Sequence, residues 1–277
     1  MSSPLMLCAR QELILALRSR WTQIFAVSFA ALALAVASSG YILSGGSGVQ
    51  DFSRTAVSLV QLTLLLVPLM SLMLGVMSIA TEQGGAELLL SQPVARRTIL
   101  LGRLLGLFAA LAASQALGFG ASGVVVFLRA GEEGVSGFFV LLAGSLVVTT
   151  ISLGLSAWLA VGAIGRRRPH ALAMALVVWF GGVILFDLVA LGAASLLPSG
   201  LASRLLILSV ILNPVDAART GMLLGIEGGA AFGPATLAFF RFAGGAGGAG
   251  LLLCLSLLVW IAAPMLLAVR RLSRVDL

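Results

Sequence analysis

Six long apolar stretches constrain the fold of this chain more than any other feature of its sequence. They cover approximately residues 22–44, 56–80, 98–128, 137–164, 171–193 and 249–269. Each has at least about the 20 residues that an α-helix needs to cross the hydrocarbon core of a bilayer. We therefore predict an all-α integral membrane protein with six transmembrane helices, in which residues 1–277 form a single domain.

The composition agrees with this fold class. Charged residues make up 10% of the chain, whereas a soluble domain contains about a quarter. The net charge of +7 comes from arginine alone, because the sequence has no lysine. In a membrane protein an excess of arginine indicates topology first, so we expect the lipid bilayer, and not nucleic acid, as a partner. Cys8 and Cys254 are far apart and form no CxxC pair, so we expect no metal site and no cofactor.

The distribution of arginine predicts the orientation of the spans. With the N-terminus in the cytoplasm, the cytoplasmic arginines are Arg10, Arg18, Arg20, Arg96, Arg97, Arg103, Arg166, Arg167, Arg168, Arg270, Arg271 and Arg274. The other side has Arg54, Arg129, Arg204, Arg219 and Arg241. Because positive charge accumulates on the cytoplasmic side, we predict that both termini are cytoplasmic and that residues 194–248 form an extracytoplasmic segment.

Residues 4–20 are too charged to span a bilayer, but they have helical periodicity. Their apolar residues recur at helical spacing, at Met6, Ala9, Leu13 and Leu17. Gln11 and Arg18 fall on another face, which predicts an amphipathic interfacial helix. The alternative, an ordinary positive flank of an uncleaved first span, explains the charges but not the periodicity.

A polar segment at residues 82–97, EQGGAELLLSQPVARR, interrupts the apolar chain between the second and third stretches. The Gly84-Gly85 pair permits a turn, and a short helix can follow it. Pro93 is tolerated only in the first turn of a helix, so we expect the third span to begin there. Leu88, Leu89 and Leu90 lie among charged residues, which is typical either of a docking surface or of a loop that returns to lipid.

The chain resembles the permease subunit of type-2 ABC exporters, and this segment is the most specific part of the resemblance. The family pattern is matched at Glu82, Gly85, Glu87, Leu88, Leu89, Pro93, Arg96 and Arg103. The chain departs from it at Ala86, where threonine is usual, and at Arg103, where lysine is usual. Residues 50–75 and 212–223 are similar to the branch that serves maturation of nitrous oxide reductase, which implies a role in assembly of a copper site.

The resemblance implies that residues 82–97 form a cytoplasmic coupling helix that contacts a separate ABC ATPase. The contact residues would be Glu82, Gly85, Glu87, Leu88, Leu89, Pro93, Arg96 and Arg97. It also implies a homodimer in the bacterial inner membrane with two ATPase copies. We expect residues 194–248 to form either an external gate or a platform for a periplasmic partner. A P-loop needs a lysine for the nucleotide phosphates, and this sequence has none, so we expect no ATPase site and no catalytic residue here.

Asp187 is the only acidic residue deep inside a predicted span. A carboxylate at a helix centre costs about 2.5–3.5 kcal/mol on insertion scales, so it requires a partner. We name Gln61 and Gln115 as candidates for an intramembrane polar site with it. Asp187 is either a substrate contact or gating element, or a structural group bonded to a neighbouring helix.

Other motifs allow weaker hypotheses. Ser122, in a GxSG motif, with His170 would be the dyad of an intramembrane enzyme, but the predicted topology puts them at opposite sides of the membrane. Met70, Met73 and Met77 share one helix face, which is more typical of packing than of a copper path. A passive membrane docking subunit is the other alternative function. In residues 194–248 we expect two short helices, one of them capped by Asn213 and beginning at Pro214.

Overall fold

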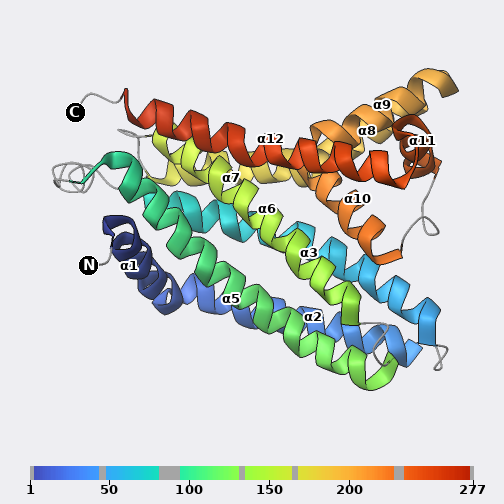
Figure 1. The fold of residues 1–277 in the computed structure, drawn as a ribbon, viewed down its shortest axis with the longest axis horizontal. Helices are drawn as coiled ribbons and strands as arrows, with labels where there is room; N and C mark the ends of the chain where they lie inside the picture. The colour runs from blue at the N-terminus through green and yellow to red at the C-terminus, as the bar shows by residue number, and fades with distance from the viewer. Residues whose placement is uncertain are drawn as a thin grey trace.

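The computed structural model of the chain is a bundle of long helices (Figure 1). It describes residues 3–43, 48–80, 94–130, 135–163, 168–227 and 234–274. Within these ranges every regular element is a helix. Of the residues assigned to the coupling segment, Glu82, Gly85, Glu87, Leu88, Leu89 and Pro93 lie outside the described ranges.

Within the described residues, six parts of the bundle are long and apolar enough to cross a membrane, as the sequence predicts. Five are single helices: α2 (Arg20–Leu43), α3 (Gly48–Ile79), α5 (Arg96–Ala130), α6 (Val135–Gly162) and α12 (Ala246–Leu272). The sixth, span five, is a series of α7 (Arg168–Phe180), the π-helix η2 (Gly181–Leu185) and α8 (Phe186–Ser195). The described part of the third span begins at Arg96, where the amides of Thr98 and Ile99 both donate to the carbonyl oxygen of Ala95. The start that we expected at Pro93 lies outside the described residues.

The helix α1 (Pro4–Arg18) precedes the spans and packs across α5 and α2. The side chain of Ser3 caps it and Pro4 occupies its first turn, which is where proline is tolerated. Among the residues that we expected on its apolar face, Met6 and Leu17 are exposed, whereas Ala9 and Leu13 are half-buried. The helix is therefore present, and its placement in a membrane interface remains a prediction.

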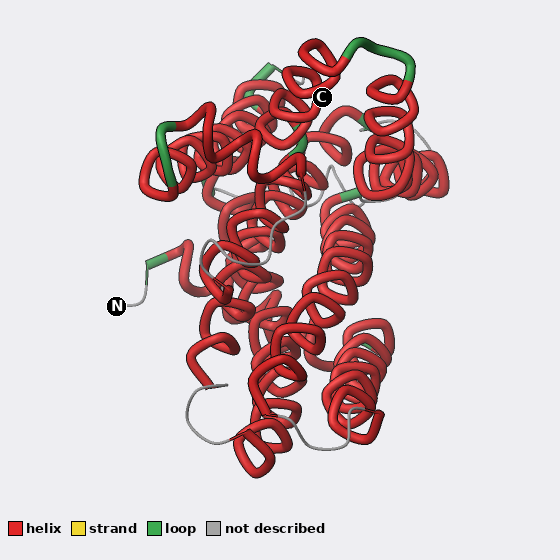
Figure 2. The backbone as a smooth tube through the Cα atoms, turned by 90° about the vertical axis from the view of Figure 1, so that its right-hand side faces the viewer, coloured by secondary structure: helices red, strands yellow, loops and turns green. Residues whose placement is uncertain are grey.

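The bundle has two distinct ends. At one of them, the α1 end, α1 meets the end of α3 and the start of α5. Ala80, Ala163 and Ala171 pack together there, after α3 and α6 and in the first turn of α7, and Arg271 of α12 lies over Gly162. The opposite end carries α9 (Ser199–Leu212) and α11 (Pro234–Ala243), and we call it the α9 end (Figure 1). Figure 2 shows the same helices from the side.

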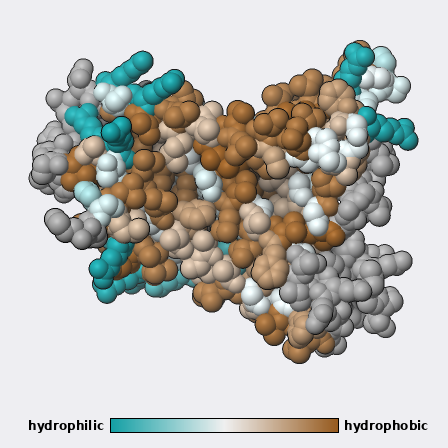
Figure 3. Space-filling view, viewed as in Figure 1, coloured by the Kyte–Doolittle hydropathy of each residue, from teal (hydrophilic) through white to brown (hydrophobic). Residues whose placement is uncertain are grey.

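Small residues and aromatic rings bring the spans close together. A Cβ built on Gly118 of α5 would lie 2.6 Å from Cδ1 of Phe29, so only glycine permits this approach of α2 and α5. Phe29 also meets Phe119 edge to face, with ring centroids 5.2 Å apart. Both rings belong to the main apolar core of α1, α2, α3, α5, α6, α10 (Pro214–Glu227) and α12. Figure 3 shows hydrophobic side chains over the middle of the visible face.

The segment predicted to be extracytoplasmic contains three helices in its described part, α9, α10 and α11, where we expected two. The additional helix, α11, begins at Pro234 after a Gly-rich stretch that we did not recognise as a boundary. The predicted cap is confirmed: α10 begins at Pro214, and the amide of Val215 donates to Oδ1 of Asn213 at 3.0 Å. α9 and α10 meet at an angle of 94°, so the chain turns back sharply at Asn213.

Candidate functional site

Three helices are joined by a polar contact at the α1 end. Arg103 of α5 donates from Nη1 to the carbonyl oxygen of Ser78 at 2.6 Å, and its Nε lies 3.9 Å from Oε2 of Glu12. The hydroxyl of Ser78 donates to Oε1 of Glu12 at 2.7 Å. The side chains of Arg103 and Glu12 are 20% and 12% exposed. This triad, Glu12, Ser78 and Arg103, therefore fixes α1 to the last turn of α3 and the second turn of α5.

The triad lies on both sides of the segment that the sequence assigns to coupling. Ser78 lies in the last turn of α3, two residues before the described chain stops at Ala80, and Arg96 begins α5. Arg97, next in the first turn of α5, is exposed, and Arg96 is half-buried. The side chain of Arg97 in the first turn of α5 is thus exposed, whereas that of Arg103, about two turns after Arg96, points inward.

Two glycines seat α1 directly on α5. A Cβ on Gly102 would lie 2.6 Å from the Cβ of Cys8, and a Cβ on Gly106 would lie 2.7 Å from the Cβ of Glu12 and overlap the carbonyl oxygen of Ala9. Glycines four residues apart are the usual means by which helices approach at backbone distance in membranes. This close contact between α1 and α5 places the Glu12 carboxylate near the guanidinium of Arg103.

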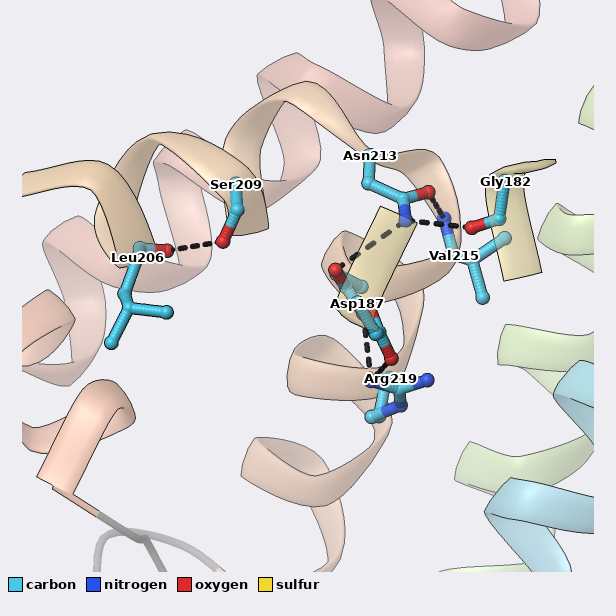
Figure 4. A network of polar contacts seen from close by, with 8 residues as sticks. Gly182, Asp187, Leu206, Ser209, Asn213, Val215 and Arg219 are labelled. Atoms are coloured by element: carbon cyan, nitrogen blue, oxygen red, sulfur yellow. Dashed lines mark hydrogen bonds and ion pairs between the residues drawn. The ribbon is translucent and has the colours of Figure 1, made fainter. Parts of the chain in front are cut away.

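A second polar cluster joins span five to α10 near the α9 end (Figure 4). One guanidinium nitrogen, Nη1 of Arg219, bonds Oδ2 of Asp187 at 2.8 Å and Oδ1 of Asp216 at 2.7 Å. Nδ2 of Asn213 donates to the carbonyl oxygen of Gly182 at 2.8 Å and to Oδ2 of Asp216 at 3.4 Å. Asp187, Asp216 and Arg219 line a cavity of about 200 Å³, together with residues that include Ser209 and Thr220.

The hydrogen bond from Asn213 to span five ends in the π-helix. A π-helix is a local departure from α-helical pairing and commonly occurs at functional positions. Gly182, its second residue, has no side chain to cover its carbonyl oxygen, and Asn213 from the α9–α10 turn approaches it. The carbonyl thereby gains a partner 31 residues away in the sequence.

Asp187 therefore has a partner that sequence reasoning missed. The structure brings it to Arg219 and not to Gln61 or Gln115. Gln61 is exposed on α3, and Gln115 is buried and donates to the hydroxyl of Thr149 at 2.8 Å. The signal that could have identified Arg219 is its spacing, because Asp216 and Arg219 are three residues apart in a helix that Asn213-Pro214 begins.

Ser122 and His170 lie at opposite ends of the bundle. The hydroxyl of Ser122 is buried in α5 and donates to the carbonyl oxygen of Gly118 at 2.8 Å, and the neighbouring Gly123 faces Phe138 in the first turns of α6. His170 is exposed in the first turn of α7 at the α1 end. Ser122 is 26 positions along α5 from Arg96, about 39 Å at 1.5 Å per residue. The two residues therefore form no dyad.

An apolar cavity of about 250 Å³ lies between α3, α6, span five, α10 and α12. Trp158, Trp179 and Trp260 line it. The indole N–H of Trp179 donates to the carbonyl oxygen of Leu65, and that of Trp260 donates to the carbonyl oxygen of Leu212. The indole N–H groups of Trp179 and Trp260 are therefore already paired, and these two rings line the cavity with apolar surface.

Comparison with known proteins agrees with this arrangement. The family described as "ABC-2 family transporter protein" matches residues 6–277. The chain is 34% identical over 273 residues to the "Probable ABC transporter permease protein NosY" of Stutzerimonas stutzeri, which covers 94% of each chain. It is 33% identical over 238 residues to the protein of the same name from Pseudomonas aeruginosa, which covers 83% of this chain and 85% of that one. The chain therefore belongs to the ABC-2 family, as a membrane-spanning transporter permease.

Proposed function

We propose that this chain is moved by a separate cytoplasmic ATPase, which presses on residues 82–97. The observation that carries the proposal is the triad of Glu12, Ser78 and Arg103. It joins α1 to both helices that flank the segment, so a displacement of the segment acts on α1, α3 and α5 together. ATP binding would close two ATPase copies, and the spans would then rock between inward- and outward-facing arrangements.

The charge distribution supports a cytoplasmic position for the α1 end. Exposed arginines gather there from helices that are distant in sequence: Arg10, Arg18, Arg20, Arg97, Arg270, Arg271 and Arg274. Hydrophilic side chains are visible at this end of the space-filling view (Figure 3). Because positive residues are retained in the cytoplasm, the proposed orientation has both termini inside a bacterial inner membrane.

We also propose a homodimer, supported by the ion pair between Asp187 of span five and Arg219 of α10. The side chains of Asp187 and Arg219 are 29% and 23% exposed, beside exposed apolar residues such as Leu188 and Leu191. Ionised groups inside a membrane face protein or a water-filled cavity and not lipid. A second copy, or the path between two copies, would cover them.

The coupling role is tested by reversing one charge in the segment. The purified ATPase would be reconstituted with the permease, and permease-stimulated ATP hydrolysis would be measured. Glu87→Arg should reduce the stimulation by about tenfold, because it places repulsion where complementary charges meet. The matched control Arg204→Glu reverses an exposed charge at the α9 end and should leave stimulation unchanged. Equal stimulation by all three proteins would contradict the assignment, and ATP-dependent transport into vesicles would exclude a passive docking subunit.

The similarity of residues 50–75 and 212–223 to the branch that serves nitrous oxide reductase supports a proposed role in assembly of its copper site. In this proposal α9–α11 form a platform for a periplasmic partner. A host strain that lacks the permease should make reductase with less bound copper, and this chain should restore it. Full copper loading without the permease would refute this role but not the coupling role.

A further inference from the structure

We infer that Asp187, Asp216 and Arg219 form a latch between α10 and span five, in which Arg219 bound to Asp187 is the closed state and Arg219 bound to Asp216 alone is the open state. The inference rests on the proposed function, which requires the spans to move relative to one another. It adds a residue, Arg219, whose position controls that movement at the end of the bundle opposite the coupling segment.

The contacts of α10 with α6 and with span five show which of these two helices can separate from it. Towards α6 it is held by interlocking apolar side chains. A Cβ on Gly144 would overlap Met222, and a Cβ on Gly225 would lie 2.8 Å from Cγ1 of Val140. Ala218 and Met222 are buried in the main core. We therefore expect α10 to move with α6.

Towards span five, the polar contacts within the described residues are few and lie close together. They are the ion pair of Arg219 with Asp187 and the hydrogen bond from Asn213 to Gly182. Both end within the six residues from Gly182 to Asp187, at and just after the π-helix. The apolar contact of Val183 with the core lies in the same short region. A small shift of this region of span five would break both polar contacts.

The second carboxylate explains how the contact can open without an unpaired cation. Asp216 and Arg219 are on the same helix, three residues apart, so their contact does not depend on span five. If span five moves away, Arg219 keeps Asp216, whose side chain is only 10% exposed. Asp187, at 29%, is the more accessible carboxylate and lines the 200 Å³ cavity, so water can replace the guanidinium there. Removing the counter-ion of a buried charge is costly, and this arrangement avoids that cost for Arg219.

The test measures how often α8 and α10 lie together in the full-length permease in nanodiscs, without any ATPase. Cys8 and Cys254 are replaced by serine, and Ala190→Cys and Leu223→Cys place thiols on two walls of the same cavity. The rate of intramolecular linkage by a short bifunctional thiol reagent is followed by intact mass. Asp187→Asn should lower this rate by about tenfold, because it removes the charge that holds Arg219 to span five.

Matched variants separate a latch from a general loss of folding. Asp216→Asn removes the other carboxylate and should change the rate by less than about twofold, because Arg219 keeps its partner on span five. The exchange of both charges, Asp187→Arg with Arg219→Asp, should restore most of the wild-type rate. Arg219→Gln provides a second way to open the latch and should match Asp187→Asn.

An unchanged rate in both Asp187→Asn and Arg219→Gln would overturn the inference, as would failure of the exchanged pair to restore linkage. ATP added with the ATPase should slow linkage in the otherwise wild-type reporter, and a constant rate would refute the opening step. Since the first comparison contains no ATPase, its failure would refute the latch even if Glu87→Arg still reduces the stimulation of the ATPase. Conversely, the latch can hold even if Glu87→Arg leaves the stimulation unchanged.

Discussion

At the scale of single residues, Arg103 has the largest structural role at the α1 end. From α5, its guanidinium donates a hydrogen bond to a backbone carbonyl of α3 and forms an ion pair with a carboxylate of α1. Glu12 is 12% exposed and would keep only the hydroxyl of Ser78 without this arginine. A partly buried carboxylate that loses its cation is strongly destabilising, so Arg103 should matter for stability as well as for coupling.

Arg103→Met should therefore lower the free energy of unfolding, measured by titration with SDS, by about 2–3 kcal/mol. The control Arg97→Met removes an exposed arginine from the first turn of the same helix and should cost less than about 0.5 kcal/mol. The double variant Arg103→Met, Glu12→Gln should recover part of the loss, because no unpaired charge remains. Equal effects of the Arg103 and Arg97 variants would show that the triad is not a stabilising contact.

The partners of charged residues were harder to predict than the residues themselves. Asp187 stands out in the sequence because it interrupts an apolar stretch. Its partner Arg219 belongs to a segment that the sequence places outside the spans, and only the 94° bend at Asn213 returns α10 to span five. Likewise, the sequence indicates only that Glu12 is a polar residue of an amphipathic helix. Its contact with Arg103 depends on how α1 packs on α5, which the sequence does not show.

At the scale of elements, α1 is attached to the bundle mainly through the Gly102 and Gly106 surface of α5. A side chain at Gly106 would occupy the space of the Ala9 carbonyl and the Glu12 side chain. The two nearest atoms are the carbonyl oxygen of Ala9 and the Cβ of Glu12. The helical backbone fixes the position of both atoms, so neither can rotate away. The contact therefore has little freedom to adapt.

Gly106→Leu should consequently detach α1 and expose its backbone to protease. Trypsin cleavage after Arg10 and Arg18 should become about tenfold faster, because proteolysis follows the population of the opened state. Gly120→Leu is the matched control on the same helix, since no described atom beyond the adjoining residues and backbone of its own helix lies within 4 Å of its Cβ position. The same cleavage rate in both variants would mean that α1 is held by other contacts.

Most elements could be predicted from hydrophobic length, and the exceptions have physical reasons. The six spans follow from apolar runs, and the start of α10 follows from Asn213-Pro214. The π-helix in span five could not be recognised from Gly181 and Gly182 alone, because the hydrogen bond to the Gly182 carbonyl comes from Asn213, which lies outside the span. The interfacial placement of α1 and the coupling helix at residues 82–97 stay predictions.

At the scale of the whole molecule, two polar contacts lie at opposite ends of an apolar bundle. The triad ties α1, α3 and α5 at one end, and the Asp187–Asp216–Arg219 cluster ties span five to α10 at the other. Between them the helices pack through small residues, such as Gly75 beside Ser156 and Gly154 beside Pro264. In our account, the ATPase displaces the helices that the triad joins, and the ion pair between Asp187 and Arg219 opens as a result.

The most direct test of this account is to ask what residues 82–97 touch in the assembled transporter. A photo-reactive amino acid would be placed at position 87, and at position 204 as a control, in complexes of the permease with its ATPase. We predict a covalent product with the ATPase from position 87 and none from position 204. Linkage from position 87 only to lipid, or linkage to the ATPase from position 204 instead, would contradict the central claim that the ATPase acts on this segment.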